Sequence, residues 1–227
     1  MSQKISVIIP AYNEEESLPH VLNDLPQDRL HQLIVVDNRS TDRTAEVARE
    51  NGATVIYEKR QGYGRACLAG MEALDAPDIV VFLDGDYSDY PEEIDLLVEP
   101  IFKDEADFVV GSRMIRKESR KALLPQARYG NMLAVFLIRM FFSYKFTDLG
   151  PFRAIRYESL QAIGMRDKNF GWTVEMQIKV VQKGLRIREI PVHYRMRIGV
   201  SKITGTVSGT LKAGTKIIYT IFKYLVT

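Results

Sequence analysis

Short apolar runs rich in β-branched residues alternate with helix-like patterns through the first half of the chain. The runs occupy residues 5–10, 33–37, 53–57, 78–83 and 107–111. Strands that are apolar at almost every position are buried on both faces, which is typical of parallel strands with helices on each side. The alternation therefore predicts an α/β fold built on a parallel sheet flanked by helices.

Helix start and stop signals separate these runs. Residues 13–16 (NEEE) have the spacing of a capping box and predict a helix that continues through Leu25. Gly52 ends a helical pattern over 42–51, and Pro91 opens another that runs to about Lys103. Further helices are predicted over 65–74, 124–142, 172–183 and 206–226, with one more strand near 186–194.

Polar side chains follow several of the apolar runs at the point where each run ends. Asp84-Gly85-Asp86 is the clearest case, because residues two apart on a strand point to the same side. Neighbouring carboxylates repel each other unless they share a proton or a cation, and Mg²⁺ and Mn²⁺ prefer oxygen ligands. Ligands of open parallel sheets bind beyond the carboxyl ends of the strands, so this edge is the candidate site. The alternative is an Asp-Gly-Asp turn that caps the following helix.

The net charge of +2 hides an uneven distribution of charge. Residues 1–110 contain 9 Lys and Arg against 23 Asp and Glu, whereas residues 111–227 contain 22 against 6. An acidic half suits a metal and neutral polar ligands, and a basic half suits phosphates or an anionic surface. The alternative is that the two halves only neutralise each other. Because no Gly/Ser linker or repeat divides the chain, we predict one domain over 1–227, with a nucleotide- and metal-binding half (1–110) and an acceptor-binding half (111–227).

Two features bear on the compartment. Cys67 is the lone cysteine and cannot form an internal disulfide, which is typical of a reducing compartment. The most apolar stretch, 132–142, is eleven residues long and includes Arg139, whereas a membrane-spanning helix needs about 20 residues. We therefore expect a cytoplasmic protein without a signal peptide, either free or peripheral on the cytoplasmic face of a membrane.

Four segments resemble motifs of one enzyme family. They occur in the family's order, each at the end of a predicted strand: 6–15 (SVIIPAYNEE), 35–42 (VVDNRSTD), 81–86 (VFLDGD) and 109–113 (VVGSR). In these segments the chain resembles the family 2 inverting glycosyltransferases of GT-A fold, and among them the dolichyl-phosphate mannose and polyprenyl-phosphate sugar synthases. The resemblance implies a GT-A fold, with a mostly parallel central sheet flanked by helices, and transfer of a sugar from a nucleotide.

The resemblance also implies a donor site. The positions that match the family's nucleotide pocket are Pro10, Tyr12, Glu14 and Asp37, the last of which accepts hydrogen bonds from the base in the family. Asp84 and Asp86 match the pair that binds the metal cofactor, Mg²⁺ or Mn²⁺, on the donor's diphosphate. A cation at this place stabilises the charge that gathers on a leaving nucleoside diphosphate. Gly64, in the loop 61–65, is interpreted as a residue near the donor phosphates, with ordinary turn chemistry as the alternative.

The basic half matches the family at positions that contact the acceptor phosphate or the leaving diphosphate. These candidates are Arg113, Arg128, Arg153, Ser201 and Lys202. Asn131 matches a family asparagine, but Ala127 replaces the serine that precedes it, and Arg128 is our substitute for that donor. Residues 148–153 (DLGPFR) have Gly-Pro where the family has Ser-Gly. Residues 197–202 (RIGVSK) are one residue shorter than the family's R-x-x-G-x-S-K, so we favour Lys202 over Arg197.

The choice of acceptor depends on whether a general base is needed. A sugar hydroxyl must lose its proton during transfer, whereas a phosphate monoester, with a second pKa of about 6, is already an anion. The chain offers several arginines and no obvious base, although Asp148 and Glu175 could serve; with Asp86 they are the predicted catalytic residues. The segments 132–142 and 206–226 are interpreted either as helices on a membrane surface or as ordinary core helices.

We therefore predict a metal-dependent inverting glycosyltransferase that moves a hexose from GDP-mannose or a UDP-sugar to a polyprenyl or dolichyl phosphate. A second hypothesis keeps the donor but transfers the sugar to a hydroxyl of a glycan or small molecule. A third, from another class, is a non-catalytic sugar-nucleotide-binding subunit of a membrane complex. The expected partners are the donor, the lipid phosphate, and a membrane surface or membrane protein, and no nucleic acid.

Overall fold

The computed structural model describes residues 3–199 and 207–225. Within this part, one sheet has the strand order β3-β2-β1-β4-β6-β5-β7. The strands are β1 (Ile5–Ala11), β2 (Leu30–Asp37), β3 (Thr54–Tyr57), β4 (Ile79–Phe82), β5 (Phe108–Ser112), β6 (Arg153–Arg156) and β7 (Ile187–Pro191). Every neighbouring pair is parallel except those of β6, which runs antiparallel to β4 and β5. The expected mostly parallel sheet is confirmed.

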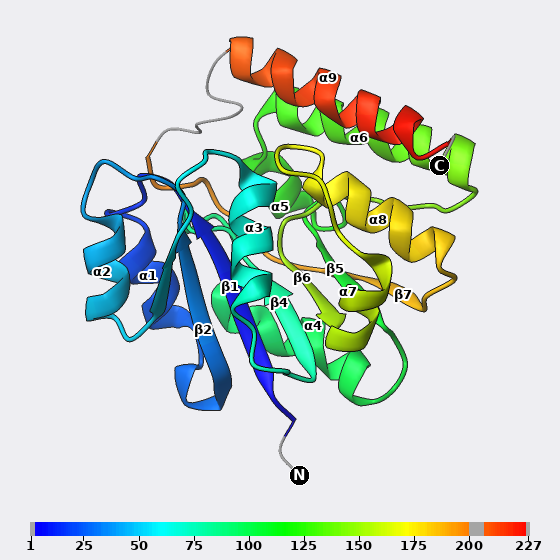
Figure 1. Ribbon diagram of the computed structural model, residues 1–227. Helices are drawn as coiled ribbons and strands as arrows, with labels where there is room; N and C mark the ends of the chain where they lie inside the picture. The colour runs from blue at the N-terminus through cyan, green and yellow to red at the C-terminus, as the bar shows by residue number, and fades with distance from the viewer. Residues whose placement is uncertain (1–2, 200–206, 226–227) are drawn as a thin grey trace.

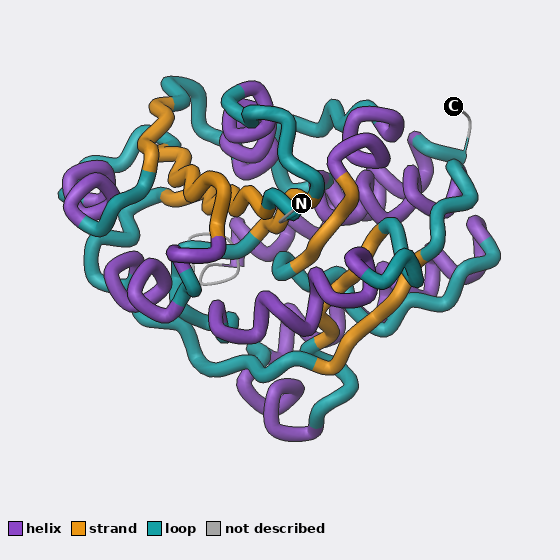
Figure 2. The backbone as a smooth tube through the Cα atoms, turned by 90° about the horizontal axis from the view of Figure 1, so that it is seen from below, coloured by secondary structure: helices purple, strands orange, loops and turns teal. Residues whose placement is uncertain are grey.

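Helices cover both faces of the sheet (Figures 1 and 2). One face carries α1 (Leu18–Asp24), α2 (Thr44–Glu50) and α4 (Ile94–Phe102). The other carries α3 (Tyr63–Glu72), α6 (Pro125–Phe142), α7 (Tyr157–Ile163), α8 (Trp172–Gln182) and α9 (Val207–Lys223). The short helix α5 (Lys117–Ala122) and the 3-10 turns η1 (Gln27–Arg29) and η2 (Pro91–Glu93) lie in connections. No helix of the described part is long and apolar enough to span a bilayer.

The apolar runs form these strands because each strand is buried from two sides. Val7 and Ile9 on β1 pack into the cluster under α1 and α4, whereas Ile8, between them, packs into the cluster under α3 and α8. All three side chains are fully buried. The parallel strands β1, β2 and β4 end at the same edge of the sheet, the upper edge in Figure 1, and α6 and α9 lie along that end of the molecule.

The predicted capping box at residues 13–16 is wrong. Helix α1 begins at Leu18, and Asn13 has φ +54° with its Oδ1 accepting a hydrogen bond from the main-chain N–H of Thr41 (2.8 Å). The asparagine therefore ties two loops of the sheet edge together. Gly52 ends α2 with φ +82°, as predicted, and Pro91 opens η2, which leads into α4. The sequence pattern did not predict β6, α5 or α7.

Candidate functional site

A cavity of about 330 Å³ opens at the carboxyl edge of the sheet. The ends of β1 and β4, the loop after β2, the start of α3 and the loop before α8 form its walls. Its lining includes five predicted donor-site residues, Pro10, Tyr12, Glu14, Asp84 and Asp86. It also includes residues that the sequence analysis had not assigned to the donor site, among them Asn38, Tyr63, Asn169, Phe170 and Arg197.

Asp84 and Asp86 follow β4 and face this cavity. The Tyr63 hydroxyl donates a hydrogen bond to Asp84 Oδ1 (2.9 Å). Burial, and then the charge of Asp86, raise the pKa of Asp84 to about 7. A divalent cation would relieve that repulsion, so these oxygen donors fit Mg²⁺ or Mn²⁺. Among the described residues no third His, Cys, Asp or Glu joins them to complete a metal-binding group, so water and phosphate oxygens would have to supply the other ligands.

Arg197 crosses the cavity between two acids. Its guanidinium lies 2.9 Å from Asp86 Oδ2 and 3.0 Å from Glu14 Oε1, while its buried Nε has no hydrogen-bond partner within residues 3–199 and 207–225. The hydroxyl of Ser17 lies 2.8 Å from Glu14 Oε2 and 2.8 Å from the carbonyl oxygen of Gly85. Arg197 therefore neutralises charge beside the carboxylate pair. The favoured Lys202 and its neighbour Ser201 lie outside the described residues.

The predicted nucleotide residue Asp37 is buried at the end of β2, where its Oδ1 accepts the main-chain N–H of Ser40 (2.9 Å). Its neighbour Asn38 lines the cavity. The side chain of Asn38 accepts a hydrogen bond from the main-chain N–H of Gly62 (2.8 Å) and donates one to the main-chain carbonyl of Arg60 (2.9 Å). Gly64 does not line the cavity. A Cβ there would lie 2.1 Å from the carbonyl oxygen of Asp167, so this glycine lets α3 pack against the loop before α8.

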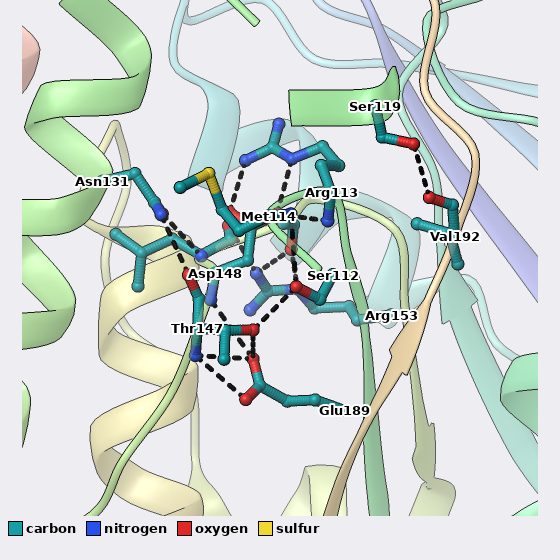
Figure 3. Close-up of polar contacts among 12 residues, drawn as sticks. Ser112, Arg113, Met114, Ser119, Asn131, Thr147, Asp148, Arg153, Glu189 and Val192 are labelled. Atoms are coloured by element: carbon teal, nitrogen blue, oxygen red, sulfur yellow. Dashed lines mark hydrogen bonds and ion pairs between the residues drawn. The ribbon is translucent and has the colours of Figure 1, made fainter. Parts of the chain in front are cut away.

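Arg113, a residue predicted to contact the acceptor, is held by a buried carboxylate (Figure 3). Its Nε and Nη2 donate to the two oxygens of Asp148, and its main-chain N–H donates to Oδ2, each at 2.8 Å. Burial lowers the pKa of Arg113, but the charge and hydrogen bonds of Asp148 outweigh it and keep that pKa well above its usual value. The guanidinium also lies over the ring of Tyr194, 5.1 Å from its centre. Asp148 thus serves as a support for Arg113.

Further polar contacts fix the segment that carries Asp148. Glu189 on β7 accepts hydrogen bonds from the N–H and hydroxyl of Thr147 (both 2.9 Å). Asn131 on α6 donates to the carbonyl of Thr147 (3.2 Å) and accepts the N–H of Leu149 (2.8 Å). Figure 3 shows Asp148 at the centre of this network. Arg113 is therefore oriented before any ligand binds.

Three predicted site residues do not line the cavity. Arg153 on β6 is fully buried and donates to three main-chain carbonyls, and burial lowers its pKa to about 10. Glu175 on α8 is fully buried and accepts hydrogen bonds from two main-chain N–H groups and the Tyr224 hydroxyl. The polar atoms of both residues are committed to contacts within the fold, and their predicted site roles stay predictions. Arg128 is exposed in the first turns of α6.

Asp89 is a buried acid with no motif around it to signal a role. Asp89 is only 1% exposed, and among the described residues neither of its carboxylate oxygens has a hydrogen-bond partner. Burial, and then the charge of Asp84, raise the pKa of Asp89 well above its usual value, and Arg113 is the cation that opposes this shift. This carboxyl group thus lies within electrostatic range of both Asp84 and Arg113.

Comparisons with known proteins identify the family of this chain. The family model described as glycosyl transferase family 2 matches residues 6–164. An uncharacterised glycosyltransferase of Mycobacterium tuberculosis is 36% identical over 210 residues, covering 92% of this chain and 94% of the relative. A dolichyl-phosphate hexose transferase of Haloferax volcanii is 35% identical over 205 residues, covering 88% and 86%.

A solved structure shares the fold. The glucosyl-3-phosphoglycerate synthase of M. tuberculosis, in complex with Mn²⁺, uridine-diphosphate-glucose and phosphoglyceric acid, superposes with a TM-score of 0.77 at 23% identity. The match covers 98% of this chain and 80% of that one. It shows a GT-A-like fold, and the family model confirms the membership that the four motifs predicted. The chain belongs to glycosyl transferase family 2 and is a glycosyltransferase.

Proposed function

We propose that this glycosyltransferase moves a hexose, with inversion, from a nucleotide diphosphate sugar to a polyprenyl phosphate at the face of a membrane. The observation that carries the choice of acceptor is the pairing of Arg113 with Asp148. Asp148, which could have served as a base, instead holds the guanidinium of Arg113 in place. A cation held in a fixed position is what binding of an anionic acceptor requires. The dolichyl-phosphate hexose transferase among the relatives supports this choice.

On the donor side, Asp84 and Asp86 would hold Mg²⁺ or Mn²⁺, and Pro10, Tyr12 and Glu14 would line the nucleotide. A divalent cation, when bound, supplies positive charge for the leaving diphosphate. Arg197 would exchange its contact with Asp86 for one with a phosphate oxygen, because the cation takes over the neutralisation of that acid. The structural neighbour that holds Mn²⁺ and a uridine diphosphate sugar supports this arrangement.

The transfer needs no proton acceptor. An oxygen of the acceptor phosphate would attack the anomeric carbon, while the bond from that carbon to the diphosphate oxygen breaks and its electron pair leaves with the nucleoside diphosphate. Arg113 would position the attacking phosphate, and Asp148 would keep the guanidinium in orientation. Attack from the side opposite the leaving group inverts the anomeric centre.

The test is transfer from labelled GDP-mannose and UDP-glucose, with Mn²⁺, in the presence and absence of polyprenyl phosphate. We expect label in the lipid fraction only when both acceptor and metal are present. Arg113→Lys should raise the acceptor KM, because a lysine cannot form the bidentate contacts that orient this cation. Arg188→Lys, an exposed arginine on β7, is the matched control. Label that never enters lipid, with any donor, would overturn the proposal.

A second candidate, transfer to a hydroxyl of a phosphorylated small molecule, is favoured by Asp89. A buried carboxyl group with raised pKa and unpaired oxygens has the properties of a general base. If this candidate is correct, Asp89→Asn should lower kcat about 10²- to 10⁴-fold, the usual contribution of a general base. Under the phosphate-acceptor mechanism the same substitution removes no proton-transfer step.

A further inference from the structure

Helices α6 and α9 form an outer layer at the end of the molecule where the parallel strands finish (Figure 1). They lie side by side, with the rings of Phe141 on α6 and Phe222 on α9 centred 5.4 Å apart. Each helix buries one side against the core, through Ala134 and Ile138 on α6 and Ile221 on α9. The opposite sides of both helices face away from the protein.

The outward sides carry large apolar residues, each between 47% and 69% exposed. They are Tyr129, Met132, Leu133, Phe136 and Met140 on α6, and Leu211, Tyr219 and Phe222 on α9. Within each helix their spacing follows the helical repeat, so they form stripes along one side. Single exposed apolar residues are ordinary, but adjacent stripes of aromatic, Met and Leu side chains on neighbouring helices mark an interaction surface.

The charges on this surface all have one sign. No Asp or Glu occurs in residues 119–147 or 207–225. Arg128 and Arg139 on α6, and Lys212 and Lys223 on α9, are exposed. A second copy of the chain would bring these cations against cations, whereas an anionic lipid surface matches both the apolar stripes and the basic charges.

We propose that α6 and α9 together form a docking surface for an anionic lipid bilayer, with the apolar stripes in the headgroup region and the Arg and Lys side chains against lipid phosphates. This inference rests on the proposed function, because a lipid acceptor is the reason for binding a bilayer. It adds to that function the surface of the protein that contacts the lipid. Binding to lipid itself requires no sugar transfer.

Contacts connect this surface to both sides of the site. On α6, Asn131 holds the segment that carries Asp148. On α9, Lys216 forms an ion pair with Asp167 (2.8 Å), in the loop that supplies Asn169 to the cavity wall. A docked bilayer would therefore lie at a fixed position relative to Arg113 and the donor cavity, as transfer to a lipid phosphate requires.

The test is binding of the full chain to phosphatidylcholine vesicles with and without phosphatidylglycerol, measured by co-sedimentation. We expect binding only to the anionic vesicles. Replacing Arg139 and Lys212 together by Gln should weaken it about 25-fold, because each basic residue near an anionic surface contributes about fivefold. Phe136→Ser should weaken it as well. The matched controls are Lys4→Gln, at the opposite end of β1, and Leu96→Ser, an exposed apolar residue on α4.

Three results would overturn the docking surface. They are equal binding with and without phosphatidylglycerol, an equal loss in the control variants, and a solution dimer that Phe136→Ser dissociates while vesicles remain unbound. Transfer to a short, water-soluble prenyl phosphate separates this inference from the proposed function. Transfer without vesicle binding would reject only the docking surface, and vesicle binding without transfer to any lipid phosphate would reject only the proposed acceptor.

Discussion

The two sides of the site that we propose to bind the donor and the acceptor differ in how completely their charges are paired. On the acceptor side, both oxygens of Asp148 accept hydrogen bonds from Arg113, and the surrounding segment is fixed by further contacts. On the donor side, burial and the charge of Asp86 raise the pKa of Asp84 to about 7, and Arg197 Nε has no hydrogen-bond partner in the described part of the chain. The acceptor side is organised before any ligand binds, whereas the donor side holds repulsion that a cation and a diphosphate would relieve.

This contrast predicts that substitutions on the acceptor side chiefly lower stability, whereas substitutions on the donor side chiefly lower activity. Breaking the Arg113–Asp148 pair leaves a buried charge without compensation and should destabilise the protein. Removing an acid from the donor side also removes repulsion, so activity should be lost without a matching loss of stability. A trade-off of this kind between stability and activity is common where a site keeps polar groups unpaired until its ligand binds.

The largest effect is expected for Asp86→Ala. Loss of a metal ligand should lower kcat/KM for sugar transfer about 10³-fold, because a bound cation contributes several kcal/mol to the transition state. Calorimetry with Mn²⁺ and nucleoside diphosphate should show binding lost in step. The Tm of the metal-free variant should fall less than that of Arg113→Met, because the lost contacts with Arg197 and Ser88 are offset by the lost repulsion with Asp84. Asp28→Ala, at an exposed acid in η1, is the control. Transfer at the wild-type rate would contradict the metal role.

The next effect is on stability and belongs to the acceptor side. Arg113→Met should lower the free energy of unfolding by about 3 kcal/mol, because it strands the fully buried Asp148. The double variant with Asp148→Leu should recover most of this loss, since it removes both charges. Urea denaturation measures both. A loss no greater than that of Arg188→Met, which breaks an exposed pair worth about 0–1 kcal/mol, would show that the acceptor side is not tightly organised.

The strands and the carboxylate pair could be predicted from the sequence because their signals are local. A strand buried on both faces is apolar at nearly every position, as β1 and β4 are, and the two acids come just after β4, at the edge where ligands of a parallel sheet bind. Strand β6 was missed because it has four residues with an arginine at each end, and it is stabilised by pairing with β4 and β5.

Side-chain partners, by contrast, depend on segments far apart in the sequence. Arg153 and Glu175 have the residue types of a phosphate-binding or proton-transfer site, but the tertiary structure buries both among main-chain groups. Arg197 was ranked below Lys202 on the spacing of its motif, yet it reaches Glu14, 183 residues away. Asp89 gave no signal, because a turn-forming Asp near a proline is ordinary.

Asp89 provides a third test of the comparison, because its replacement should stabilise the protein whereas replacement of Arg113 should destabilise it. Asp89→Leu should raise the free energy of unfolding by about 1–3 kcal/mol, because it replaces an unpaired buried acid by an apolar group of similar size. The control is Asp107→Leu, at an acid whose pKa is lowered to about 2, chiefly by its hydrogen bonds with Arg186. That variant should be destabilised. Destabilisation by both substitutions would mean that Asp89 has a stabilising partner in solution.

The smallest effect is the pH dependence of metal binding. We expect metal binding on the donor side to release a proton from Asp84. With a pKa of about 7, Asp84 is protonated in the metal-free protein below neutral pH, so a cation must displace a proton to bind. Because the folded pKa lies above the unfolded value of about 3.9, this group makes the metal-free protein less stable as pH rises from about 4 through 7.

Mn²⁺ affinity should therefore fall by up to about tenfold for each pH unit below 7 and level off above it. Calorimetry in buffers of different ionisation enthalpy would count the protons released. Tyr63→Phe removes a hydrogen bond that lowers the pKa of Asp84, so the bend in this profile should move to higher pH. Arg113→Lys keeps the positive charge that also acts on Asp84, so it should leave the bend unmoved. An affinity independent of pH would mean that Asp84 is already ionised, and that the repulsion on the donor side is relieved without a metal.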